Sequence, residues 1–133
     1  MGAVHKQLGE IHGRLYEGGS STTGYPKAEA VDDIGISSVT VAELEYGASK
    51  SRHPTKNRLA LDQFISPLDV AAFDRDAATA YGRLRANLEQ KGTPIGAMDL
   101  LIAAHALSLR VRLITNNARE FRRVPGLRIE NWV

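Results

Sequence analysis

Three acidic residues, Glu43, Asp99 and Glu120, are the best candidates for chemistry in this sequence. Each is expected close to the start of a helix. Carboxylates that converge on one place repel one another unless a divalent cation lies between them, and hard oxygen ligands favour Mg²⁺ or Mn²⁺. Such ions activate water and neutralise the charge that develops on a scissile phosphate. The acids therefore indicate metal-assisted phosphodiester hydrolysis as a reaction class.

Each acid also has a structural explanation. Glu43 follows Thr40 by three residues and Glu120 follows Asn117 by three, which is the spacing of a capping box. Acids in a first helical turn also suit the helix dipole. Asp99 differs, because it opens the most apolar helix expected in the chain, and a carboxylate that faces a core must be paired, neutralised or metal-bound. From spacing alone, both explanations stay open.

Other chemistries find little support in this sequence. It contains no cysteine, which excludes disulfides, thiol nucleophiles and cysteine-ligated metals. Its four histidines form no pair at zinc spacing, and glycine-rich phosphate loops and nucleophile elbows are absent. We expect His105 to be a core histidine with its hydrogen bonds satisfied, and Tyr46 and Trp132 to serve packing.

Positive charge gathers in two stretches, although the formal net charge is only +2. Residues 50–58 contain no acid, and residues 110–128 contain only Glu120. The candidates for phosphate contacts in these stretches are Lys50, Arg52, Lys56, Arg119, Arg122 and Arg123. Basic clusters of this kind can follow a nucleic-acid backbone, whereas the alternatives are a solvated surface or an acidic protein partner.

The composition, 43% hydrophobic and 24% charged residues, is typical of a soluble globular protein. No apolar run reaches the ~20 residues needed to span a bilayer, and the N-terminus does not read as a secretion signal. We therefore expect a cytoplasmic protein without membrane contact. The 133 residues suit one domain.

The elements that must position the acids alternate between strand and helix, which predicts an α/β fold with a mostly parallel sheet flanked by helices. Expected strands cover residues 34–39, 68–73, 111–115 and 127–131. Expected helices cover residues 3–17, 55–66, 74–91, 98–109 and 117–121, and a further helix begins at residue 41, which Gly47 weakens or ends. Residues 18–26 are glycine- and serine-rich and predict a linker.

Two groups of polar residues follow strands in this scheme. Glu43 comes after the strand at 34–39, and Asn116, Asn117 and Glu120 come after the strand at 111–115. In a parallel sheet both groups emerge at the carboxyl edge, where open α/β folds bind their ligands. The spacing therefore predicts one shared site at this edge.

Three ordered blocks of the sequence resemble the VapC toxins, which are PIN-domain ribonucleases of type II toxin–antitoxin modules. The blocks are residues 36–47 (ISSVTVAELEYG), 92–106 (GTPIGAMDLLIAAHA) and 114–121 (ITNNAREF), followed by shorter matches at 124–127 and 130–132. The resemblance implies a PIN fold and Mg²⁺- or Mn²⁺-dependent endonucleolytic cleavage of RNA. It also implies a homodimer, a VapB-like antitoxin partner and an RNA substrate for which transfer RNA is a common family choice.

Carried over residue by residue, the resemblance assigns metal binding to Glu43 and Asp99. It adds Asn117 and Glu120 to the catalytic group, with Thr115 and Asn116 as their supporting shell. The basic residues named above would then contact RNA.

The first thirty residues depart from the family pattern. The family's first acid belongs to an Asp-Thr-Asn motif that ends an apolar first strand, and this sequence has no such motif. Residues 34–133 are family-like, whereas residues 1–30 predict a divergent helix and linker, so that the first strand is missing or replaced. One hypothesis is a shifted or remodelled reading frame, which the upstream DNA would test. Loss of one carboxylate predicts impaired cleavage, or a non-catalytic module that binds antitoxin or RNA.

Overall fold

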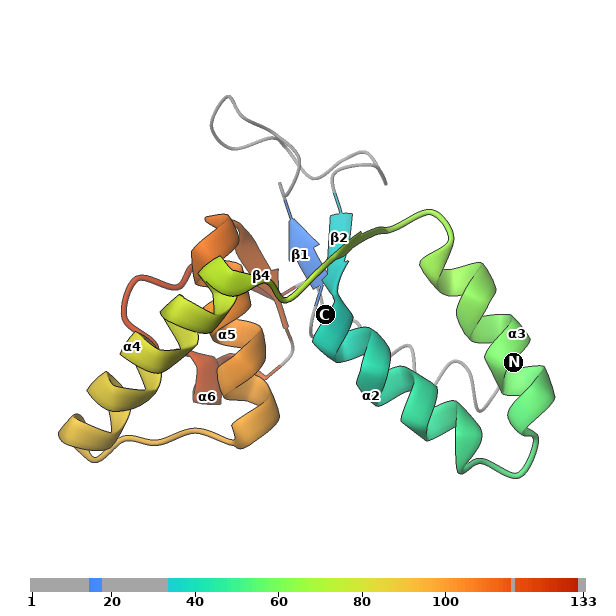
Figure 1. The fold of residues 1–133 in the computed structure, drawn as a ribbon, viewed down its shortest axis with the longest axis horizontal. Helices are drawn as coiled ribbons and strands as arrows, with labels where there is room; N and C mark the ends of the chain where they lie inside the picture. Colours follow the sequence, from blue (N-terminus) through green and yellow to red (C-terminus); the bar gives the residue numbers. More distant parts are fainter. Residues whose placement is uncertain (1–14, 18–33, 116, 132–133) are drawn as a thin grey trace.

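The computed structural model describes residues 15–17, 34–115 and 117–131. Its centre is a five-stranded sheet in the order β3-β2-β1-β4-β5 (Figure 1). The strands are β1 (Leu15–Glu17), β2 (Ile34–Ser37), β3 (Asp69–Ala71), β4 (Arg112–Ile114) and β5 (Ile129–Glu130).

Four of these five strands run in the same direction. β2 pairs in parallel with β3, and β4 pairs in parallel with β5, while β1 lies antiparallel between β2 and β4. The expected mostly parallel sheet is confirmed, and β1 is its exception. The carboxyl ends of β2 and β4 lie at one edge of the sheet, so the residues that follow them are brought to the same side of the molecule.

β1 runs opposite to both of its neighbours in the sheet. Leu15 is aligned with Ile36 and Ile114, whereas Glu17 is aligned with Ile34 and Arg112. Because the strand is reversed, its carboxyl end lies at the edge opposite to the carboxyl ends of β2 and β4. An acid at the end of β1 would be on the wrong side of the sheet for the site predicted from sequence.

The expected helix over residues 3–17 is wrong at its C-terminal end, because Leu15–Glu17 form β1. The helical spacing of apolar residues is a local preference, whereas β2 and β4 each present backbone groups that need partners inside the sheet. Pairing on both sides of β1 satisfies those groups. Residues 3–14 and the expected linker at 18–26 lie outside the described residues.

Helices follow most strands. They are α2 (Ser38–Ser49), α3 (Pro54–Ile65), α4 (Arg75–Lys91), α5 (Ala97–Leu109) and α6 (Ala118–Phe121). Two expectations need correction: α2 begins at Ser38, three residues early, so that Val39 is helical, and it continues through Gly47. The Asp74 cap is confirmed, because its carboxylate accepts a hydrogen bond from the Ala77 amide at 3.0 Å.

In the ranges that the structure describes, no helix combines the length and apolar character needed to cross a membrane.

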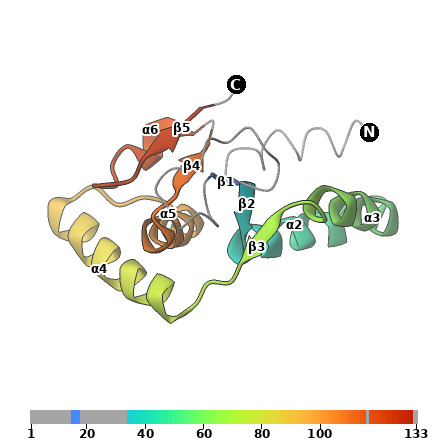
Figure 2. The same ribbon diagram turned by 90° about the horizontal axis from the view of Figure 1, so that it is seen from above.

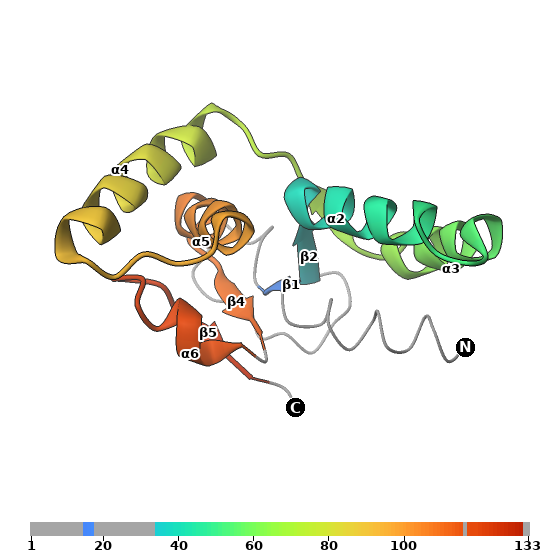
Figure 3. The same ribbon diagram turned by 90° about the horizontal axis from the view of Figure 1, so that it is seen from below.

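The helices form two groups on either side of the central strands (Figures 1 and 2). α2 and α3 contact each other, and Leu44 of α2 and Phe64 of α3 pack against the buried Ile36 of β2 and Ile114 of β4. α4 packs along α5 on the other side, over a larger buried cluster. Its members include Leu84, Leu88, Leu100, Ile102, Leu113 and Phe121. Figure 3 shows α6 and β5 beyond β4, on the side away from α2.

Candidate active site

Asp99, Asn117 and Glu120 lie together where α5 begins and α6 follows β4. Asp99 is in the first turn of α5 and only 8% exposed, although its helix is almost wholly apolar. Glu120 lies in the single turn of α6 and accepts a hydrogen bond from the Asn117 side-chain amide at 3.3 Å. The structure therefore brings together three of the four residues that the sequence placed in a catalytic group.

Glu120 reaches across to the start of α5. Its Oε1 accepts a hydrogen bond of 2.6 Å from the amide of Gly96, the N-cap residue of α5. An added Cβ at Gly96 would lie 3.4 Å from that oxygen and 3.9 Å from Asp99 Oδ2, so both carboxylates border this glycine. Glu120 thus stabilises the N-terminus of a helix that is not its own.

The prediction that Asn117 and Glu120 form a capping box for their own helix, α6, is wrong. Asn117 is the N-cap residue of α6, but its side chain makes no capping hydrogen bond to the helix. A four-residue helix offers few amides to satisfy, whereas the Gly96 amide at the start of α5 needs an acceptor. The acid caps a helix 24 residues away in sequence, and no local pattern could predict this partner.

A second contact fixes the same loop. Arg123 Nη1 donates a hydrogen bond of 2.9 Å to the carbonyl of Pro94. Glu120 and Arg123 together hold the 94–96 segment from the α6 side, one by accepting and one by donating. The position of Asp99, three residues after Gly96, therefore depends on residues that follow β4.

The surroundings of Glu120 favour its charged form. The Gly96 amide is the main cause that lowers the pKa of the Glu120 carboxyl, partial burial opposes it, and hydrogen bonds from Asp99 and Asn117 and the charge of Arg123 lower the pKa further. A hydrogen bond between two carboxyl groups requires a shared proton. A cation is the other means of holding two such oxygens close together.

Glu43 occupies the second turn of α2. The predicted capping box of Thr40 and Glu43 is wrong, because α2 begins earlier and Ser37 is its N-cap, accepting a hydrogen bond of 3.0 Å from the Val39 amide. Glu43 instead lines a shallow hollow with Met98, the residue before Asp99. The structure therefore places Glu43 on the α5 side of α2, next to the first turn that carries Asp99.

The donor chemistry suits Mg²⁺ or Mn²⁺, since every candidate ligand is an oxygen. The number of donors does not suffice, however. Within residues 15–17, 34–115 and 117–131, no group of three or more His, Asp or Glu side chains is arranged to hold a metal ion. Asp99 and Glu120 border Gly96 together, and Glu43 lies on α2 beside Met98. The described residues thus do not fit a complete metal site.

Thr115 is one of the two residues that the resemblance assigns to a supporting shell. Thr115 is buried at the end of β4, and its Oγ1 accepts a hydrogen bond of 2.9 Å from the Asn117 amide. This contact fixes the turn that leads from β4 into α6. Asn116 lies outside the described residues.

His105 is a core histidine, as expected from sequence. It is fully buried, its Nδ1 is hydrogen-bonded to Ser37 Oγ at 2.8 Å, and its ring meets Phe73 edge to face. Burial is the main cause that lowers the pKa of His105, against a backbone hydrogen bond to Ala72 and the charge of Asp74. Because Ser37 ends β2 and caps α2, this hydrogen bond joins the α2 side of the molecule to α5.

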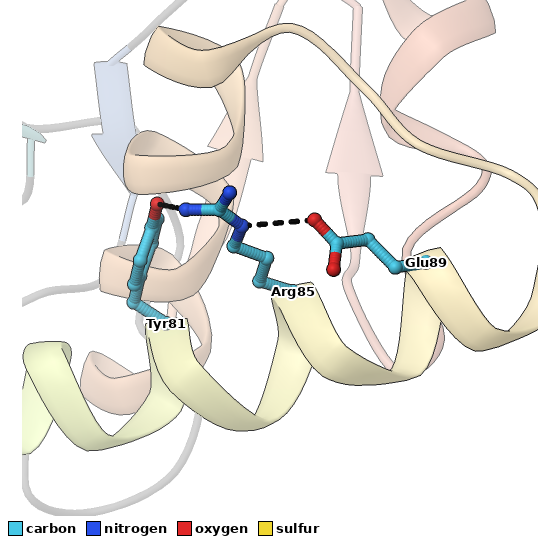
Figure 4. A network of polar contacts seen from close by, with 3 residues as sticks. All are labelled: Tyr81, Arg85 and Glu89. Carbon is cyan, nitrogen blue, oxygen red and sulfur yellow. Dashed lines mark hydrogen bonds and ion pairs between the residues drawn. The ribbon is translucent and has the colours of Figure 1, made fainter.

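All six basic residues of the predicted set lie at the surface. Exposed members of the predicted set are Lys50, Arg52, Lys56, Arg119, Arg122 and Arg123. A separate network on α4 lies outside the acid group: Arg85 donates hydrogen bonds of 3.0 Å to Tyr81 and to Glu89 (Figure 4). All three side chains of this network come from one helix face.

The expectation that Tyr46 serves packing is wrong, because its side chain is 66% exposed. It stands on α2 with the Lys50 ammonium 4.8 Å from its ring centre. The sequence did not indicate this exposure, since an isolated aromatic residue in a helix usually faces a core. The Trp132 prediction falls outside the described residues.

Comparison with known proteins identifies the family. A PIN-domain model matches residues 22–127. Ribonuclease VapC2 of Rickettsia felis is 50% identical over 99 residues, covering 74% of each chain. The tRNA(fMet)-specific endonuclease VapC of Salmonella typhimurium is 50% identical over 97 residues, covering 73% of this chain and 74% of the relative.

Solved structures agree with these sequence relatives. The DNA-bound VapBC complex of Salmonella typhimurium contains a chain with a TM-score of 0.73 at 50% identity, and the alignment covers 74% of both chains. The promoter-bound VapBC2 complex of Rickettsia felis gives a TM-score of 0.72 at 48% identity over the same shares. Fold, sequence blocks and relatives lead to one assignment: this chain belongs to the PIN-domain family and, within it, to the VapC-type toxins of toxin–antitoxin modules.

Proposed function

We propose that this chain is a VapC-type endoribonuclease whose cleavage of RNA is weakened by its replaced first strand. One observation carries the proposal: Asp99 and Glu120 lie together at the start of α5, while the reversed β1 directs its carboxyl end to the opposite edge of the sheet. The later acids of the family pattern are in the sequence, whereas the acid that ends β1, Glu17, is aligned with Ile34 and Arg112 at the opposite edge of the sheet.

Within this proposal, Glu43 and Asp99 bind Mg²⁺ or Mn²⁺, and Asn117 and Glu120 complete the catalytic group. Thr115 and Asn116 support that group. The shortage of a further carboxylate predicts weak metal binding and a misplaced water, and small misplacements alone cost ~10²-fold in rate. Glu120 is already engaged by the Gly96 amide, so we expect it to position Asp99 as well as to contribute charge.

The substrate class and partners follow from the relatives. Those relatives are named ribonucleases, and one is named a tRNA(fMet)-specific endonuclease, so transfer RNA is the first substrate to test. Similar structures are VapBC complexes, which supports a VapB-like antitoxin as partner. A homodimer is the oligomer that the family resemblance implies, and the cytoplasm is the proposed location.

The test is an RNA cleavage assay with the full chain and Mg²⁺ or Mn²⁺, beside Asp99→Asn. We expect slow cleavage of RNA that the substitution abolishes, because Asp99 is the most deeply buried acid of the group. Chelation of the metal should have the same effect. Cleavage as fast as that of the Salmonella relative would contradict the claim of impairment while supporting the site.

A second candidate function is binding without turnover. It is favoured by the incomplete metal site together with the exposed basic residues of α3 and the loop before it. This alternative predicts that the chain binds RNA or a VapB-like antitoxin with the same affinity before and after Asp99→Asn, and that neither form cleaves RNA. Failure to bind either partner at low salt would remove it.

A further inference from the structure

A hollow of about 390 Å³ lies between α2 and the start of α5. Ala42, Glu43 and Tyr46 line it from α2, and Met98 lines it from α5. Its volume is at the low end of the roughly 300–1,000 Å³ of small-ligand pockets. The hollow therefore has room for one planar group of nucleobase size directly beside a candidate catalytic acid.

Two of the lining side chains are large, apolar and exposed. Tyr46 is 66% exposed and Met98 is 37% exposed. Because both side chains line one hollow, their exposed apolar surface is gathered in one place, as at surfaces that bind another molecule. A tyrosine ring and a thioether are also the kinds of wall against which a flat aromatic ligand packs well.

Lys50 adds positive charge at the same place. Its amide donates a hydrogen bond of 3.0 Å to the Tyr46 carbonyl, which fixes the end of α2, and its ammonium lies 4.8 Å from the Tyr46 ring centre. Arg52 and Lys56 continue this charge beyond the helix end. A base beside Tyr46 would thus have its phosphate close to a cation.

We propose that Tyr46, Met98 and Lys50 form a nucleotide subsite in which an unstacked RNA base packs into the hollow beside Glu43 and Lys50 binds the adjoining phosphate. This inference rests on the proposed function and adds the residues that grip the substrate. It explains why the aromatic residue is exposed one helical turn after Glu43. The same subsite excludes a fully stacked duplex, because a paired base cannot enter the hollow.

The test measures binding without cleavage. A short fluorescein-labelled single-stranded RNA of mixed sequence is titrated with the full chain in EDTA at low salt, and fluorescence anisotropy gives the Kd. Stacking on an aromatic side chain contributes roughly 1–3 kcal/mol per base, so Tyr46→Ala should weaken binding by about 5- to 150-fold. Tyr46→Phe keeps the ring and should bind within about twofold of the wild type.

The contribution of Lys50 is tested by the salt dependence of RNA binding. Lys50→Ala should weaken binding and reduce the slope of log Kd against log salt by about one, and Lys50→Arg should restore both. Leu59→Ala is the matched control, since Leu59 is 60% exposed on the neighbouring α3 but does not line the hollow. It should leave the Kd unchanged. Thermal melting of every variant confirms that the fold is intact.

Several outcomes overturn the subsite. Tyr46→Ala that binds RNA like the wild type, or Tyr46→Phe that binds as weakly as Tyr46→Ala, would each contradict stacking on the ring. Loss of antitoxin binding in Tyr46→Ala with unchanged RNA binding would make the surface a protein contact. The proposed cleavage fails separately: RNA binding that depends on Tyr46, without turnover in Mg²⁺ or Mn²⁺, supports the subsite and contradicts the enzyme.

Discussion

The two halves of the molecule hold their acids in different ways. The half built from α4, α5, β4 and α6 has the larger buried cluster, and two long-range hydrogen bonds fix the loop before Asp99. The half built from β2, α2, α3 and β3 has a core of two fully buried residues, Ile36 and Ile114, the second contributed by β4. It also exposes Tyr46, Leu59 and Val70. Burial is thus concentrated on the side that carries the acid pair.

The candidate acids are divided between these two halves. Asp99 and Glu120 belong to the first half and Glu43 to the second, and β1 pairs with both β2 and β4 between them. β1 therefore lies between the strand that precedes Glu43 and the strand that precedes Glu120. Side chains within a well-packed half are held by that half's own contacts. The position of one half relative to the other depends on the pairing of β1 with β2 and β4.

The largest expected effect compares one phenylalanine from each half. Phe121 is fully buried in the larger cluster, so Phe121→Ala should lower the free energy of unfolding by about 3–5 kcal/mol. Phe64 is only partly buried, and Phe64→Ala should cost about 1–2 kcal/mol. Urea denaturation followed by circular dichroism measures both. Equal losses would contradict the unequal distribution of burial.

The next prediction restores the strand between the halves. Residues 1–33 are replaced by the N-terminal segment of the Salmonella relative, up to its counterpart of Ile34. If the reversed strand is the cause of weak cleavage, the chimera should cleave RNA about 10²-fold faster than the wild type in Mg²⁺ or Mn²⁺. The same chimera with Asp99→Asn is the control and should be inactive. An intact chimera that cleaves no faster would place the impairment elsewhere.

The smallest expected effect concerns the hydrogen bond that joins the halves through Ser37 and His105. The pKa of His105 is lowered in the folded chain, chiefly by burial, so the unfolded chain binds the proton at higher pH than the folded one. Stability is therefore complete above about pH 6.5 and falls as the pH drops from there toward the lower folded-state pKa. Urea denaturation across this interval should show the fall.

His105→Gln should flatten that pH dependence, because the buried group no longer titrates. His53→Gln is the control, since His53 is exposed and its side chain makes no capping hydrogen bond to α3. A pH dependence that disappears in His53→Gln and persists in His105→Gln would assign the effect to the wrong histidine.

Much of the fold could be predicted because its signals are local. Asp74 and the apolar stripe of α4, the nearly uniform apolar run of α5, and the strand at 112–114 all carry their information within a few residues. β1 could not be predicted in this way, because Leu15–Glu17 are ordered by partners at Ile34–Ser37 and Arg112–Ile114. Pairing across the chain overrode the helical spacing that precedes it.

The candidate site likewise contains one residue that local sequence indicated and contacts that only the structure shows. Asp99 stood out in the sequence because a carboxylate inside an apolar helix is costly, and the structure places it in a polar group. The true partner of Glu120 is the Gly96 amide, and that of Arg123 is the Pro94 carbonyl. Neither contact leaves a pattern in the sequence, since each joins loops that are distant along the chain.

The three-residue β1 has a further consequence for the behaviour of the sheet during local opening. The Leu113 amide donates a hydrogen bond of 2.9 Å to the Arg128 carbonyl, and the Thr115 amide donates one of 2.9 Å to the Glu130 carbonyl, so β4 keeps β5 as a neighbour when β1 detaches. β2 likewise keeps β3. Each remaining strand pair would then present one bare edge, and bare edges recruit strands from other chains. The resistance of this protein to aggregation therefore depends on how firmly Leu15–Glu17 stay in place.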